Sequence, residues 1–89
     1  MNKRFYKVTI RTRDLFNFTT SAMIKQYDTN PFIFAAHNSK DGQLVDLRIS
    51  CTQNERLIIG VALKDYILRI VPVAADGREL SFMERLFNA

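Results

Sequence analysis

The chain has 89 residues, of which 47% are hydrophobic and 25% are charged, a composition typical of a globular protein and unlike that of a disordered one. This length allows a single domain over residues 1–89 and no second core. The only cysteine, Cys51, excludes an internal disulfide. No signal-type apolar region follows the basic start, and the longest apolar run, residues 57–63, is too short for a membrane span. We therefore expect a cytoplasmic protein with no membrane partner.

Positive charge is concentrated near the N-terminus. Residues 1–25 contain six of the thirteen Lys and Arg residues and a single acid, Asp14. Residues 26–89 contain seven basic and eight acidic residues, and the whole chain has a formal net charge of +4. Such an uneven distribution favours a polyanion or an acidic protein surface as the partner.

Residues 3–13 alternate as a strand with one buried face does. Tyr6, Val8 and Ile10 lie on the face expected to meet the core. The other face is expected to meet solvent and carries four cations, one ring and one threonine: Lys3, Phe5, Lys7, Thr9, Arg11 and Arg13.

Residues 15–27 fit two patterns. Leu15, Phe18, Ala22 and Met23 share one face of a helix, whereas Phe16, Phe18, Thr20, Ala22 and Ile24 share one face of a strand. The hydroxyl run 19–21 suits a helix start, so we predict a short helix from about Thr20 to Tyr27. Pro31 requires the chain before it to leave the helical conformation.

Residues 32–38 and 43–50 flank the turn-forming cluster 39–42 and predict a β-hairpin. The predicted register sets Asn38 opposite Gln43. It gathers the large apolar side chains of both strands on one face, with the facing pairs Phe32–Ile49, Phe34–Leu47 and Ala36–Val45. Ile33 then points to the other face.

Thr52 and Glu55 have the spacing of a capping box and predict a helix that continues through Val61 and Ala62. A hairpin of residues 57–63 with 66–73 is the competing interpretation. Residues 67–74 predict a strand, and Pro72 assigns it to a sheet edge because proline cannot donate to a ladder. Residues 76–79 predict the start of a short C-terminal helix whose apolar side comprises Leu80, Met83, Leu86 and Phe87.

The order strand, helix, strand, strand, helix, strand predicts an α+β fold of the ferredoxin-like (split βαβ) type. This is a two-layer sandwich with a four-stranded antiparallel sheet in the order 4-1-3-2, here followed by a short C-terminal helix. A β-rich meander with one or two helices is the alternative. In the sandwich both helices cover one face of the sheet, and the other face is open to a partner.

No constellation of catalytic residues is apparent. His37 and Cys51 are the only residues of their kinds, and the predicted hairpin separates them by about 23 Å, at about 3.3 Å per residue. One Cys and one His supply no paired metal ligands, and Gly42, Gly60 and Gly77 form no phosphate loop. We therefore expect no enzyme, no metal and no cofactor.

A basic strand interleaved with aromatic rings suits single-stranded nucleic acid, because cations contact phosphates and rings stack on bases. We predict a non-catalytic protein that binds RNA or single-stranded DNA through the open face, with the site residues Phe5, Lys7, Arg11, Arg13, Arg48 and Arg69. The alternative is a protein–protein interaction module, an inhibitor or adaptor, that uses the same face. It would bind an acidic partner or form a homodimer, with Ile33 and Val71 as its apolar contacts.

Overall fold

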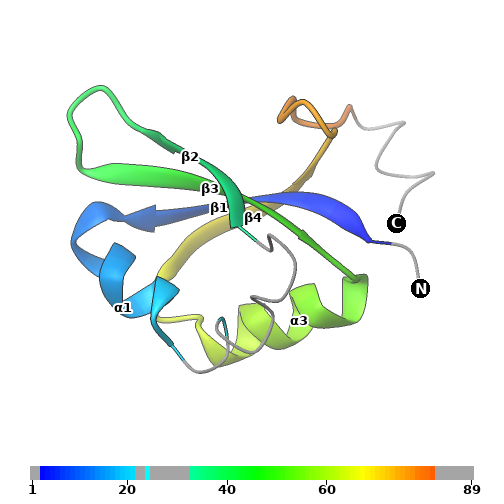
Figure 1. The fold of residues 1–89 in the computed structure, drawn as a ribbon, viewed down its shortest axis with the longest axis horizontal. Coiled ribbons are helices and arrows are strands. Elements are labelled where there is room, and N and C mark those ends of the chain that lie inside the picture. The colour runs from blue at the N-terminus through cyan, green and yellow to red at the C-terminus, as the bar shows by residue number, and fades with distance from the viewer. Residues whose placement is uncertain (1–2, 22–23, 25–32, 82–89) are drawn as a thin grey trace.

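The computed structural model describes residues 3–21, 24 and 33–81, which form a four-stranded antiparallel sheet and two short helices (Figure 1). The strands are β1 (Arg4–Arg11), β2 (Ile33–Asn38), β3 (Leu44–Cys51) and β4 (Ile67–Val73). A 3-10 turn, η1 (Thr12–Asp14), leads into α1 (Leu15–Thr19), and α3 (Gln53–Ala62) connects β3 to β4. The strand order β2-β3-β1-β4 confirms the predicted order 4-1-3-2 and makes β4, with Pro72, an edge strand.

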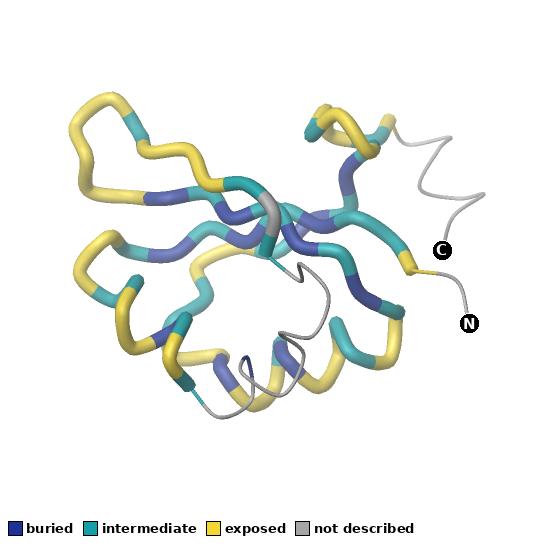
Figure 2. Tube along the Cα trace, in the orientation of Figure 1, coloured by how far each residue is buried: buried dark blue, intermediate teal, exposed yellow. Residues whose placement is uncertain are grey.

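Both helices lie on the same side of the sheet (Figure 1). We call this side of the sheet the helix face and the opposite side the outer face. The core lies between the sheet and the helices, where Val8 and Leu47 of the strands meet Phe18 of α1 and Ile59 of α3. Buried and partly exposed positions alternate along the central strands (Figure 2). The predicted burial of Tyr6, Val8 and Ile10 on β1 is confirmed.

The β2–β3 hairpin forms, but its predicted register is wrong by two residues. Asn38 pairs with Val45 and Ala36 with Leu47. The loop decides this register, because the Ser39 N–H donates to the Leu44 carbonyl at 2.9 Å and the Asp41 carboxylate accepts from Ser39 Oγ and the Gln43 N–H. These hydrogen bonds hold the pKa of Asp41 below its ordinary value. A shift of two residues keeps each side chain of residues 35–38 on its predicted side of the sheet.

At the other end of β2, a bulge between Ile33 and Ala35 changes the side on which Ile33 lies. Ile33 pairs with Ile49 and packs against the core, so its predicted position on the outer face is wrong. A bulge inserts one residue into one strand and so reverses the alternation beyond it. Phe32, the predicted partner of Ile49, lies outside the described residues.

The helix predicted from Thr20 begins earlier than expected. Leu15–Thr19 form α1, and Thr20 ends it, with its hydroxyl donating to the Phe16 carbonyl at 2.6 Å. Burial of Phe18 and partial burial of Leu15 outweigh the preference of hydroxyl residues for a helix start, because side-chain packing is worth more than a cap. Most of the predicted helix, residues 22–23 and 25–27, lies outside the described residues.

The helix predicted after Thr52 is confirmed, and the competing hairpin is wrong. The Thr52 hydroxyl accepts from the Glu55 N–H at 3.1 Å, and the Glu55 carboxylate accepts from the Thr52 N–H at 2.8 Å. Such a cap is worth about 1 kcal/mol and offsets the low helix propensity of Gly60 and the β-branched residues. Within the described ranges, no helix combines the length and apolarity that a bilayer crossing needs.

The chain after β4 turns back on itself instead of starting a helix at Asp76. The Ala74 N–H donates to the Arg78 carbonyl at 2.8 Å, and Glu79 forms an antiparallel bridge with Val73. Asp76 accepts from the Arg78 N–H, which closes a turn around Gly77 at a φ of +91°. The predicted helix start is therefore wrong, and the rest of that helix, residues 82–87, lies outside the described part of the chain.

Candidate functional site

The outer face carries five of the six predicted site residues on adjacent strands: Phe5, Lys7, Arg11, Arg48 and Arg69. Lys7 of β1 lies between Arg48 of β3 and Val71 of β4, and Thr9, two residues on, pairs with Arg69. Phe5 pairs with Val73, on the same side of the sheet. The helices leave this face uncovered, as the sequence predicts, but the turn of residues 74–79 rises over part of it (Figure 1).

Two of these cations meet at one carboxylate. Lys7 Nζ lies 3.0 Å and Arg69 Nη1 3.2 Å from the same oxygen, Glu79 Oε1. The Lys7 side chain is 21% exposed and that of Arg69 54%, so solvent screens this contact and its net stabilisation is at most about 1 kcal/mol. The sequence does not signal this arrangement, since Glu79 is 72 residues from Lys7.

Arg48 is held beneath the turn. Its Nη2 lies 2.8 Å from His37 Nε2, and because a guanidinium can only donate, His37 is the acceptor of this contact. The backbone of Gly77 approaches so closely that a Cβ there would lie 2.6 Å from Arg48 Nη1. Arg48 is therefore less available to a ligand than Arg69.

This close approach leads to a prediction for Gly77→Ala. Both Gly42 and Gly77 have positive φ, +73° and +91°, so an alanine at either position costs about 1–2 kcal/mol in backbone strain. Only Gly77 also meets a neighbour, whereas a Cβ at Gly42 would meet nothing within 4 Å. We expect Gly77→Ala to lower the free energy of unfolding by about 1 kcal/mol more than Gly42→Ala, in urea titrations.

The matched variant in that comparison is Gly42→Ala, and Arg48→Ala serves as a second background. Removing the guanidinium should bring the cost of Gly77→Ala down to that of Gly42→Ala. Equal costs of the two glycine substitutions in the wild-type background would contradict the contact between the turn and Arg48.

Arg11 and Arg13 lie apart from the Glu79 cluster. Both form ion pairs with Asp14, where β1 leads into η1. Arg11 Nη1 lies 3.8 Å from Asp14 Oδ2, and Arg13 Nε lies 3.9 Å from Asp14 Oδ1. Arg11 is four residues along the strand from Lys7, a separation of about 13 Å. Arg13 is 76% exposed in its side chain and remains accessible. The predicted cations thus form two groups along β1.

The two apolar residues assigned to a homodimer contact, Ile33 and Val71, are little exposed. Val71 is 9% exposed, and Ile33 packs against the core. They therefore present little apolar surface to a second copy of the chain. Among the described residues of the outer face, Leu44, at 37%, is the large aliphatic side chain that is exposed.

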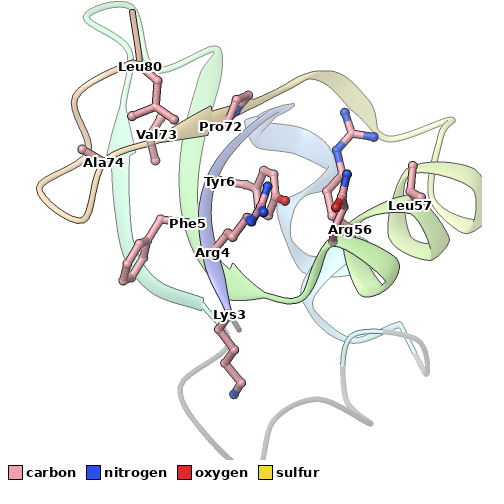
Figure 3. A pocket seen from close by; sticks show the side chains of 11 residues that line it. Lys3, Arg4, Phe5, Tyr6, Arg56, Leu57, Pro72, Val73, Ala74 and Leu80 are labelled. Carbon is pink, nitrogen blue, oxygen red and sulfur yellow. The ribbon is translucent and has the colours of Figure 1, made fainter. Parts of the chain in front are cut away.

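A cavity of about 470 Å³ lies where β1 begins, β4 ends and α3 starts (Figure 3). We call it the end cavity. Its described lining includes three cations, Lys3, Arg4 and Arg56, and no acidic residue. Apolar side chains form much of the rest, among them Phe5, Tyr6, Leu57, Pro72 and Leu80.

The sequence prediction missed the end cavity. Lys3 and Arg4 stand out only as part of the basic start, and Arg56 lies in the first turns of a helix where a solvated charge is the ordinary expectation. Arg4 and Arg56 both act on the Tyr6 hydroxyl, since their charges lower its pKa while burial, the larger effect, raises it. The signal available in the sequence is the capping box, which sets the start of α3 directly after Cys51, the partner of Arg4 in the sheet.

His37 and Cys51 do not form a catalytic pair. His37 pairs with Asp46 and not with Leu44, so Cys51 lies five residues away along β3, about 16 Å. Cys51 is 1% exposed, and burial together with the neighbouring Glu55 raises the pKa of its thiol to about 12. Cys51 is a protonated core side chain at neutral pH.

We expect Cys51 to react with thiol reagents at mildly alkaline pH only as fast as the chain unfolds, and at once in denaturant. Its thiol has a higher pKa in the folded protein than its ordinary value of 9.0. Above that value the unfolded chain loses a proton that the folded protein keeps, so stability should fall as the pH rises through this range. Cys51→Ala should weaken this pH dependence, and fast labelling of native protein would contradict the burial.

Among the described residues no three His, Cys, Asp or Glu side chains gather in a way that could hold a metal ion. Comparison with protein-family models, with curated proteins and with solved structures finds no match to this chain.

Proposed function

We propose that this protein is a cytoplasmic, non-catalytic module that binds single-stranded nucleic acid through the outer face of its sheet. Lys7 and Arg69 contact the phosphates, Arg11 and Arg13 extend the basic track along β1, and Phe5 offers a ring for stacking. Arg48, on the neighbouring strand, adds positive charge beside Lys7. We further propose that the fold is ferredoxin-like, which the strand order and the placement of both helices on one face support.

One observation carries the proposal. Two cations from different strands approach a single carboxylate oxygen, Glu79 Oε1, at 3.0 and 3.2 Å. A phosphate oxygen has the same charge and the same need for donors, so it can replace that carboxylate oxygen between Lys7 and Arg69. The carboxylate itself belongs to a turn at the chain's surface, which contacts the sheet through the Val73–Glu79 bridge.

The test measures binding of fluorescent single-stranded RNA and DNA oligonucleotides by anisotropy over a range of salt concentrations. Affinity should fall steeply with salt, and Lys7→Ala combined with Arg69→Ala should reduce the slope of log affinity on log salt by about 1.4, since each phosphate contact contributes about 0.7 for single strands. Lys40→Ala combined with Lys64→Ala is the control, because both lysines are exposed and lie off the outer face. It removes the same charge and should change the slope far less.

Absence of binding to RNA, single-stranded DNA and duplex DNA at low salt would overturn the proposal. Equal slopes for the two double variants would also overturn it, because binding would then follow net charge and not this face.

A protein partner is the second candidate, and the exposed side of α3 favours it. Leu57, Ile58 and Val61 are 52%, 48% and 76% exposed and lie close together on one helix, and an exposed group of apolar side chains can mark a protein–protein contact. If this side forms a contact between copies, light scattering should show a size that depends on concentration and that Val61→Lys abolishes. A constant monomer size would exclude the self-association form of this candidate.

A further inference from the structure

The end cavity contains cations that the described part of the chain does not neutralise. Ion pairs among the described residues involve Lys7, Arg11, Arg13 and Arg69, and none involves Lys3, Arg4 or Arg56. The Lys3 side chain extends away from the other two (Figure 3), whereas the charges of Arg4 and Arg56 both act on the Tyr6 hydroxyl. Two positive side chains on one concave surface repel each other, and an anion between them removes that repulsion. The cavity therefore has the electrostatic character of an anion site.

The apolar lining of the end cavity indicates that its ligand has an apolar group as well as a negative charge. Phe5 and Leu80 line the cavity on one side of the strand pair, and Tyr6, Leu57 and Pro72 line it toward α3 (Figure 3). A volume of about 470 Å³ lies in the lower part of the range of small-ligand pockets, about 300–1,000 Å³. It can hold one flat apolar group together with an anionic group, and it has no room for a folded partner.

The charge count favours a dianion. An internal phosphodiester carries one negative charge, whereas a terminal phosphomonoester carries about 1.5 to 2 at neutral pH and three acceptor oxygens. The two guanidinium groups of Arg4 and Arg56 match the charge of the terminal group better. Bases stack on aromatic rings with a gain of about 1–3 kcal/mol each, and Phe5 supplies such a ring at the cavity wall.

The end cavity is continuous with the outer face of the sheet. β1 runs directly from the cavity, at Lys3 to Tyr6, to Lys7 on the outer face, and Phe5 belongs to both surfaces. A strand whose end lies in the cavity can therefore continue along β1 past Lys7 and Arg69.

We propose that the end cavity binds the phosphorylated end of a nucleic-acid strand, with the terminal phosphate between Arg4 and Arg56 and the terminal base against the apolar wall. This inference rests on the proposed function and adds to it a preference for one chemical form of the strand. It also assigns a polarity, since only one end of the strand enters the cavity.

The experiment compares one single-stranded oligonucleotide in three forms: with a 5′-phosphate, with a 3′-phosphate, and with hydroxyls at both ends. One phosphorylated form should bind about tenfold more tightly than the unphosphorylated form, a difference of about 1.4 kcal/mol. Arg56→Gln and, separately, Arg4→Gln should each reduce this preference. Lys64→Gln is the control, because it removes one charge outside the cavity and should leave the preference unchanged.

Competition separates the two parts of the site. A nucleoside monophosphate should displace the phosphorylated oligonucleotide at a lower concentration than inorganic phosphate, because only the nucleotide brings a base to the apolar wall. Equal potency of the two competitors would overturn the assignment of the base.

The outcomes also separate this inference from the proposed function. Equal affinity for the three oligonucleotides, with salt-dependent binding intact, would overturn the end cavity as a terminus site and leave the proposed function standing. A preference for a phosphorylated end that survives both Arg56→Gln and Arg4→Gln would overturn its placement in this cavity. Absence of binding to any of the oligonucleotides would overturn both proposals.

Discussion

Replacing Phe18 by alanine should lower the free energy of unfolding by about 3–5 kcal/mol, because a large buried ring is lost and the cavity it leaves refills only in part. Phe18 is fully buried, and it is the α1 residue that contacts the core together with Leu15. A domain of this size has only about 5–10 kcal/mol of stability in total, so Phe18→Ala should remove much of it. Guanidinium unfolding followed by circular dichroism measures the change.

Phe16→Ala is the matched control for Phe18→Ala. It makes the same chemical change two residues away in the same short helix, but Phe16 is 74% exposed, so its loss should change stability by less than about 0.5 kcal/mol. If Phe18→Ala fails to fold, Phe18→Leu should fold with a stability between that variant and the wild type. Similar effects of Phe16→Ala and Phe18→Ala would contradict the orientation of α1.

Replacing Glu79 by glutamine should increase affinity for single-stranded nucleic acid about tenfold at low salt. The carboxylate now neutralises Lys7 and Arg69 at 3.0 and 3.2 Å, and a phosphate must displace it before it can contact them. Without that charge, the slope of log affinity on log salt should steepen by about 0.7, the value of one further phosphate contact. The same anisotropy titrations measure both quantities.

Asp65→Asn is the control for Glu79→Gln. It raises the net charge by the same amount at an exposed position in the turn after α3, and Asp65 has no ion pair with a described residue. We expect it to change the affinity by less than about twofold. Equal gains from the two substitutions would show that net charge alone governs binding. A loss of affinity in Glu79→Gln would mean that Glu79 orients the two cations for a ligand and does not compete with one.

Periodicity predicts the sheet well where a strand is central. β1 and β3 each have neighbours on both edges and a core on one face, so their alternate residues must be apolar, and Val8 and Leu47 are buried as expected. The capping box of α3 is equally local, because both of its hydrogen bonds join Thr52 to Glu55. In these segments the local pattern and the tertiary environment require the same residues.

Registers and helix starts are less accessible to such reasoning. The apolar pattern of a hairpin repeats every two residues, so it cannot distinguish Asn38 opposite Gln43 from Asn38 opposite Val45. Hydrogen bonds within the loop decide between the two. The bulge at Ile33 and the early start of α1 depend on which side chain fills the core, and no single segment contains that information.

For the candidate site too, some features follow from the local sequence and others from the tertiary structure. By itself the sequence determined that β1 has a cationic side and an apolar side, because alternation is a property of the strand alone. Only the tertiary structure decided how those cations are used. The turn after β4 brings Glu79 back to Lys7 across 72 residues, and the start of α3 brings Arg56 to the cavity beside Arg4. Contacts between residues so distant in the chain depend on how the whole sheet and its connections pack, and a local pattern of charge does not encode them.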